Sequence, residues 1–173
     1  MHRVCYLLLL ILVVACTPSQ ETEPMPAAAP EAASEPNASA PIAANELPVA
    51  DIVSVAVTGE ANSYTFAVTI SSADTGCEQY ADWWEVVDVQ TGELLYRRIL
   101  VHSHVDEQPF TRSGGPVAVA PEQQVVIRGH MGGIQSRYGG QVLQGSVETG
   151  FSPAEDSLPG LETVEPLPEG CTF

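Results

Sequence analysis

The chain has 173 residues, with 22 acidic side chains against 6 basic ones, and its net charge is −16. All of the basic residues are arginines. Nucleic acids and anionic lipid surfaces are recognised through basic patches, so this balance argues against both as partners. The simplest use of the acidity is to keep the protein soluble, including in a salty medium, and no D-x-D-x-D-G loop indicates a calcium site.

The N-terminus predicts an exported lipoprotein. A basic start at Arg3 precedes an apolar run that is too short to cross a bilayer as a helix, which is typical of a secretory signal peptide over residues 1–15. The end of this run, Val-Val-Ala before Cys16, resembles the lipobox of bacterial lipoproteins, where cleavage occurs just before the cysteine. The resemblance implies a diacylglycerol thioether on Cys16 and acylation of the new amino terminus, for example with palmitate. An ordinary signal peptide with a chance cysteine is the alternative.

The lipid would hold the protein in the cell envelope as a membrane anchor. Two or three acyl chains give stable anchoring, whereas a single chain gives only marginal binding. Thr17 follows Cys16, in place of the aspartate that commonly retains lipoproteins in the inner membrane. In a Gram-negative cell we therefore expect the outer membrane, with the protein facing the periplasm or the cell surface.

Residues 16–47 form the next segment, which is rich in proline, alanine, serine and glutamate and lacks aromatic side chains. Such a composition cannot bury enough apolar surface to offset the entropy of ordering the chain. We expect a disordered tether, extended by its prolines, that holds a domain away from the lipid surface.

From residue 48 to residue 150 the pattern predicts a β-sandwich. Val53, Val55 and Val57 alternate with small or polar residues, and later runs alternate in the same way. The expected strands are 51–59, 64–70, 83–89, 94–102, 117–121, 124–131 and 141–149. About seven strands in about 100 residues are typical of an all-β, immunoglobulin-like antiparallel sandwich, and a closed barrel is the alternative. Residues 151–173 are acidic and proline-rich, and we expect them to lie along the domain as irregular chain.

The cysteines predict one disulfide. Cys5 would leave with the signal peptide and Cys16 would carry lipid, so Cys77 and Cys171 remain. Two cysteines in an exported domain most simply pair with each other. That bond would hold the far C-terminus against the early part of the domain. A reactive or metal-binding thiol is the alternative, although neither cysteine lies in a C-x-x-C motif.

The densest group of chemically able side chains is the run HSHVDEQPFTRS at residues 102–113. If the preceding strand continues through it, His102 and His104 point to the same side and can share one Zn²⁺ or Cu²⁺ ion. Glu107 and His130 are further candidate ligands of a type that suits these metals. The alternative is that the histidines are hydrogen-bonded residues at a strand end, packed on an aromatic side chain.

The second half of the same run predicts a structural corner. A proline restrains an extended turn, Phe110 enters the core, and Arg112 pairs with an acid such as Glu107. The pair Gly114-Gly115 predicts a further turn. An enzyme would need Glu107 or a neighbouring serine as its reactive group, but no G-x-S-x-G elbow is present. We therefore expect no catalytic residue.

Adjacent aromatic residues suggest a surface for a partner. Trp83 and Trp84 are neighbours on one predicted strand, so one faces the core and the other faces outward. The outer indole, together with Tyr80, could stack a sugar ring or contact an apolar patch of another protein. The alternative is that a neighbouring loop covers it.

The run at residues 80–113 resembles a family of uncharacterised secreted bacterial proteins. The shared pattern is Tyr-Ala-Asp-x-Trp-Glu-Val, a glycine turn, an Arg-x-Leu strand, His-x-His and Glu-Gln-Pro-Phe-Thr-Arg, with Tyr-Gly-Gly later. The matching positions are Tyr80, Ala81, Asp82, Trp84, Glu85, Val86, Gly92, Arg98, Leu100, His102, His104, residues 107–112 and residues 138–140. Ser103 stands where that family has proline. The resemblance implies a compact secreted domain and names no activity.

These features predict a lipid-anchored cell-envelope β-sandwich of the binding or interaction type, with an unknown protein or glycan partner. The alternative is a zinc- or copper-binding domain that uses the His-x-His motif. No other cofactor is expected.

Overall fold

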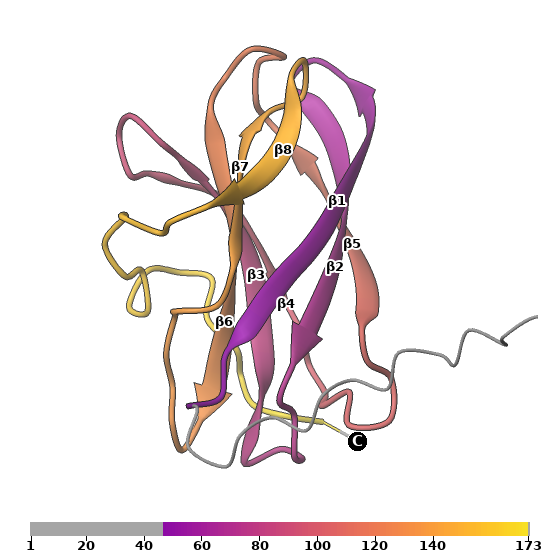
Figure 1. The fold of residues 1–173 in the computed structure, drawn as a ribbon, viewed down its shortest axis with the longest axis vertical. Helices are drawn as coiled ribbons and strands as arrows, with labels where there is room; N and C mark the ends of the chain where they lie inside the picture. Colours follow the sequence, from indigo (N-terminus) through magenta and orange to yellow (C-terminus); the bar gives the residue numbers. More distant parts are fainter. Residues whose placement is uncertain (1–46, 173) are drawn as a thin grey trace, which may run out of the picture. The chain divides into compact units, whose positions relative to one another are not determined.

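The computed structural model describes residues 47–172, which form two antiparallel sheets packed face to face, without a helix (Figure 1). The first sheet has the strand order β1-β2-β5 and the second has the order β4-β3-β6-β7-β8. The strands are β1 (Ala50–Glu60), β2 (Ser63–Ser72), β3 (Gln79–Asp88), β4 (Leu94–Ile99), β5 (Phe110–Val117), β6 (Val125–Gly133), β7 (Val142–Ser146) and β8 (Gly150–Ala154). The predicted all-β sandwich is confirmed, with eight strands.

No helix of the described chain is long and apolar enough to span a membrane.

The core lies between the sheets and follows from the alternation of side chains. In β2, Phe66, Val68 and Ile70 are fully buried, whereas the residues between them are more exposed. On the facing sheet, Trp84 and Val86 of β3 enter the same core. Each such side chain stabilises the fold by roughly 1.5–3 kcal/mol through its burial.

The strands β3 and β6 are covered on both faces. Every residue of β3 is buried, and so is every residue of β6 except its last. One face packs on the other sheet. The opposite face lies under residues 156–172, which run along the domain as the irregular chain that the sequence predicts. Cys77 and Cys171 form the predicted disulfide, and Thr172 donates a backbone hydrogen bond to the Val101 carbonyl at 2.6 Å.

Two strands differ from the prediction, and the strand expected at 117–121 is wrong, because only Val117 belongs to a strand there, at the end of β5. β8 lies in the segment that we expected to be an irregular tail, and it pairs with β7 over five residue pairs. β5 begins at Phe110, where we expected a corner and a turn, and it pairs with β2. The pair Gly114-Gly115 lies inside this strand, and both positions need glycine because a side chain would not fit there. A Cβ at Gly114 would lie 2.7 Å from the Tyr96 hydroxyl, and one at Gly115 would lie 2.7 Å from the Tyr64 carbonyl oxygen.

Candidate functional site

The predicted lipidation site, Cys16, lies outside the described residues, as does most of the predicted tether. Of the predicted metal ligands, His102 and His104 are close together, with ring centroids 4.6 Å apart. His104 is buried and stacks on Phe110 with 3.7 Å between ring centroids, while His102 is exposed. Neither ring nitrogen of His104 has a hydrogen-bond partner in the described part of the chain. Burial, followed by the charges of Arg112 and His102, lowers the pKa of His104 below its usual value.

Glu107, the third predicted ligand, belongs to a surface ion pair. Its carboxylate accepts a hydrogen bond from the Arg112 guanidinium at 2.8 Å, and this bond lowers the pKa of Glu107. The predicted pairing of Arg112 with Glu107 and the burial of Phe110 are therefore confirmed, although Phe110 and Arg112 lie in β5 and not in a corner. The carboxylate that lies nearer to His104 is Asp74, which accepts the His104 backbone N–H at 2.8 Å.

His130, the fourth predicted ligand, makes a different set of contacts, with Asp82 and Ser136. Within residues 47–172 no group of three or more histidine, cysteine, aspartate or glutamate side chains is arranged to hold a metal ion. The structure thus brings His102 and His104 together but does not add Glu107 and His130 to them. The zinc or copper site stays a prediction.

The expectation that one indole of the tryptophan pair faces solvent is wrong. Trp83 and Trp84 are 3% and 0% exposed, and Tyr80 is also buried. Trp84 lies in the sandwich core, where we expected one of the two. Trp83 lies on the opposite face, where the Arg97 guanidinium covers its ring at 4.3 Å from the centroid. These three aromatic residues therefore offer no exposed surface to a partner.

A buried ionic network explains how the outer face of β3 is covered. Glu85 is fully buried, and its carboxylate accepts hydrogen bonds from Arg97 Nε at 2.8 Å, Arg128 Nε at 2.7 Å and the Tyr138 hydroxyl at 3.0 Å. Burial, followed by the nearby negative charge of Glu85, raises the pKa of Tyr138 to about 12. We call these four residues the Glu85 network.

The same arginines bind the C-terminal segment. Arg97 donates to the carbonyls of Leu161 at 2.9 Å and Pro166 at 3.1 Å. Arg128 donates to the carbonyl of Pro159 at 2.9 Å and also pairs with Asp156 at 3.1 Å. The carboxylate and both guanidinium groups of the Glu85 network therefore bind other groups of the protein, which assigns the network a structural role.

A second polar group lies beside it and was not anticipated. His130 Nδ1 lies 2.7 Å from Asp82 Oδ1, and His130 Nε2 lies 3.3 Å from Ser136 Oγ. The imidazole is 1% exposed and stacks on Trp83 with 3.8 Å between ring centroids, while the Tyr138 ring meets it edge-on. Burial raises the pKa of Asp82, and its hydrogen bond with His130 partly offsets this rise. Ser136 is exposed. We call these residues the Asp82–His130–Ser136 group.

The register between β3 and β6 creates this group. The pairing has a bulge between Ala81 and Trp83, and Trp83 lies opposite His130. Both Asp82 and Trp83 therefore contact the same imidazole. Ser136 follows in the loop after β6, which returns to pair Arg137 with Met131. No local sequence pattern could have shown this contact, because it depends on which β6 residue lies opposite the bulge.

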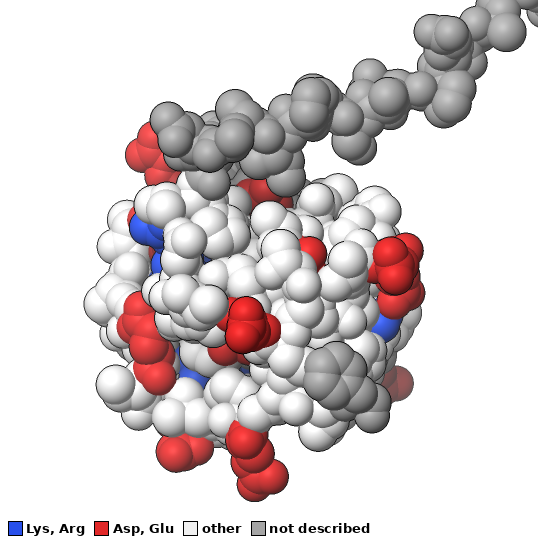
Figure 2. Space-filling view, turned by 90° about the horizontal axis from the view of Figure 1, so that it is seen from below, with Lys and Arg blue, Asp and Glu red and all other residues white. Residues whose placement is uncertain are grey.

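A groove adjoins the exposed end of the Asp82–His130–Ser136 group. Its volume is about 970 Å³, and both sequence neighbours of Ser136 line it. The lining residues are Leu47, Pro48, Val49, Asp51, Ser71, Ser72, Ala73, Thr75, Gln79, Ile134, Gln135, Arg137, Tyr138 and Gly139. Leu47 and Ile134 are large apolar side chains left 56% and 78% exposed. Figure 2 views the end of the sandwich where β1 begins and β6 ends, and carboxylates there far outnumber basic side chains.

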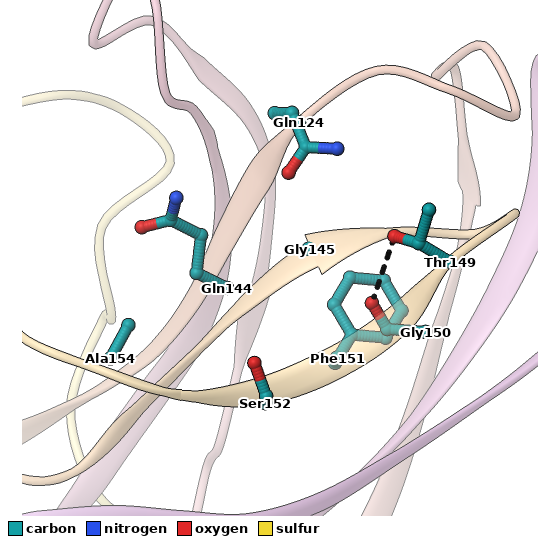
Figure 3. Close-up of a pocket in the computed structure, with 8 residues that line it drawn as sticks. All are labelled: Gln124, Gln144, Gly145, Thr149, Gly150, Phe151, Ser152 and Ala154. Carbon is teal, nitrogen blue, oxygen red and sulfur yellow. Dashed lines mark hydrogen bonds between the residues drawn. The ribbon is translucent and has the colours of Figure 1, made fainter.

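A smaller hollow of about 440 Å³ lies on the β7–β8 hairpin, around Gln144, Phe151 and Ser152 (Figure 3). The hydroxyl of Thr149 is hydrogen-bonded within the hairpin, to the Gly150 carbonyl at 3.4 Å. None of the residues that line this hollow is charged. The larger groove is therefore the stronger candidate for a binding site.

Comparison with known proteins gives one relative. Over 94 residues the chain is 38% identical to a protein of Halomicrobium mukohataei named "Putative lipoprotein". The match covers 54% of this chain and 45% of that protein, so the chain spans less than half of its relative's length. No family model matches the chain. No solved structure matches it either.

Proposed function

We propose that this protein is a lipid-anchored cell-envelope domain that binds a small amphiphilic molecule in the groove beside Ser136. The observation that carries the binding part is the composition of the groove, where exposed apolar side chains lie next to Arg137. Its volume of about 970 Å³ lies within the usual range for small-molecule sites. The ligand class that fits is a compound with an apolar body and a carboxylate or carbonyl group.

Arg137 supplies the polar part of this recognition. Arg97, Arg112 and Arg128 each form an ion pair with a carboxylate. Among the described residues, the Arg137 side chain has no carboxylate partner within ion-pair distance, and it is only partly exposed. A guanidinium in that position can bind a ligand carboxylate through two parallel hydrogen bonds.

The anchoring part is supported by the lipobox-like sequence at Cys16 and by the name of the Halomicrobium mukohataei relative. Expression in a bacterial host with an alkyne-labelled fatty acid tests it. We expect label on the wild-type chain in the membrane fraction. Cys16→Ala should abolish the label and release the protein, and equal labelling of both chains would contradict the anchor.

The groove is tested with 1-anilinonaphthalene-8-sulfonate, an apolar ring system that carries one anionic group. The full chain with Cys16→Ala should bind this probe. Arg137→Gln should weaken binding about tenfold or more, because a charged hydrogen bond contributes roughly 1.5–3 kcal/mol. Arg98→Gln is the matched control, since Arg98 is an exposed arginine outside the groove. Equal affinity of all three chains, with unchanged melting temperatures, would contradict the groove. Displacement of the probe by a glycan or a protein would instead identify the partner that the sequence suggested.

The alternative function is a zinc or copper site at His102 and His104, and the unpartnered ring nitrogens of His104 favour it. Titration of the metal-depleted protein with either ion tests this proposal. A stoichiometric complex that disappears in the chain carrying His102→Ala and His104→Ala would support it, and the absence of any complex would rule it out.

A further inference from the structure

We infer that Ser136 is a nucleophile activated by His130 and Asp82, and that it forms an acyl-enzyme with carboxylic esters bound in the adjacent groove. The substrate class rests on the proposed function, because the groove and Arg137 select an apolar compound with a carbonyl group. The reactivity of Ser136 rests on the Asp82–His130–Ser136 group alone.

The contacts follow the order that nucleophile activation requires. Asp82 Oδ1 lies 2.7 Å from one imidazole nitrogen of His130, and the other imidazole nitrogen lies 3.3 Å from Ser136 Oγ. The carboxylate holds the ring in the tautomer whose Nε2 accepts a proton, and it stabilises the imidazolium when that proton arrives. Such hydrogen bonds are often long before substrate binds, and they tighten in the complex.

Burial fixes the base and the acid, whereas the hydroxyl remains accessible. Asp82 and His130 are 5% and 1% exposed, and Trp83 and Tyr138 hold the imidazole from its face and its edge. Ser136 is exposed and is the member of the group that a substrate can reach. The neighbouring Glu85 network has no such accessible group, because its carboxylate and guanidinium groups bind one another within the protein.

Backbone hydrogen bonds fix the residues on both sides of Ser136, and the N–H of Ser136 itself remains available as a donor. The backbone N–H of Gln135 donates to Gln79 Oε1 at 3.1 Å, and the N–H of Arg137 donates to the Met131 carbonyl at 2.8 Å. The N–H of Ser136 makes no hydrogen bond with any residue of the described chain. The N–H of the nucleophile itself is a common oxyanion donor in acyl transfer.

The reaction needs only water as a second reactant. Ser136 Oγ attacks the ester carbonyl carbon while its proton passes to His130 Nε2. The tetrahedral intermediate then collapses, the bond to the alcohol oxygen breaks, and His130 returns the proton to that oxygen. Water next attacks the acyl-serine with His130 as base, which releases the carboxylic acid and restores the serine hydroxyl.

A fluorophosphonate probe tests the inference on the full chain with Cys16→Ala. We expect one adduct, located on Ser136 by peptide mass spectrometry and absent in Ser136→Ala. Ser152→Ala is the control, because Ser152 is an exposed serine whose hydroxyl has no imidazole partner among the described residues. Asp82→Asn should slow labelling at least tenfold in chains that retain cooperative melting, since the imidazole loses its orienting carboxylate.

Hydrolysis of p-nitrophenyl acetate should follow the labelling, with full loss in Ser136→Ala. The absence of labelling at Ser136 in a folded chain would overturn the inference, even if the naphthalene sulfonate still binds. Labelling of Ser136 in a chain that does not bind that probe would support the nucleophile and overturn the groove. The two proposals can therefore fail separately.

Discussion

The Glu85 network and the Asp82–His130–Ser136 group lie side by side on β3 and β6, yet they end differently. In the first, the carboxylate and both guanidinium groups are buried and bound, in part by the C-terminal segment. In the second, the buried carboxylate and imidazole lead to an exposed hydroxyl. Buried polar groups alone thus do not mark a functional site. The difference lies in whether the last member of the group meets solvent.

The largest expected effect is a loss of stability when the Glu85 network is broken. Glu85→Gln removes the carboxylate that Arg97 and Arg128 share, and it leaves two buried guanidinium groups undercompensated. We expect a loss of about 3–5 kcal/mol in the free energy of unfolding, measured by urea denaturation. Glu107→Gln breaks an exposed ion pair and is the control, with no measurable change expected. A similar stability for both variants would contradict a structural role for the Glu85 network.

The next largest effect concerns the cover over that network. The disulfide joins residues 94 positions apart and fixes the end of the segment that Arg97 and Arg128 bind. Cys77→Ser combined with Cys171→Ser should destabilise the protein by roughly 2–4 kcal/mol. Hydrogen exchange should rise first in residues 156–172 and only later in β3. Uniform exchange throughout the domain would show that the segment is not a separate cover.

The smallest of these effects is a dependence on pH at His104. Its pKa is lowered in the folded state, chiefly by burial, so the unfolded chain binds more protons just below the ordinary histidine pKa of about 6.5. Stability should therefore fall as the pH drops through 6.5 towards the lower folded pKa, and level off below it.

A comparison of variants isolates this contribution. His104→Phe should remove the difference in stability between neutral and mildly acidic buffer, measured in the presence of a chelator. His102→Ala, at an exposed position, should largely retain it. If only His102→Ala abolished the pH dependence of stability, that dependence would come from His102, and the prediction for His104 would be contradicted.

Local patterns predicted much of this fold. Alternation placed strands where β1, β2, β3, β4, β6 and β7 lie, and the cysteine count predicted the pairing of Cys77 with Cys171. β5 was missed because a Gly-Gly pair usually marks a turn, whereas here it allows the chain to pass close to Tyr96 and the backbone at Tyr64. β8 was missed because prolines and acids mask a short edge strand.

The site was much less predictable, because it depends on contacts between distant segments. One of the two tryptophans was expected at the surface, since nothing near Trp83 in sequence shows that Arg97 and the C-terminal segment cover it. His130 was grouped with other histidines by residue type, but the β3–β6 register places it beside Asp82. A single serine in a loop carries no signal of its own.

The most direct test of the Asp82–His130–Ser136 group is the pH dependence of thiol alkylation in Ser136→Cys. Ser152→Cys is the reference. An imidazole next to the thiol should lower its pKa well below the usual value of about 8.5, so iodoacetamide should react rapidly near neutral pH. We predict this behaviour for Ser136→Cys and an ordinary profile for Ser152→Cys. Identical profiles centred near 8.5, in two folded chains, would contradict activation of Ser136 by His130.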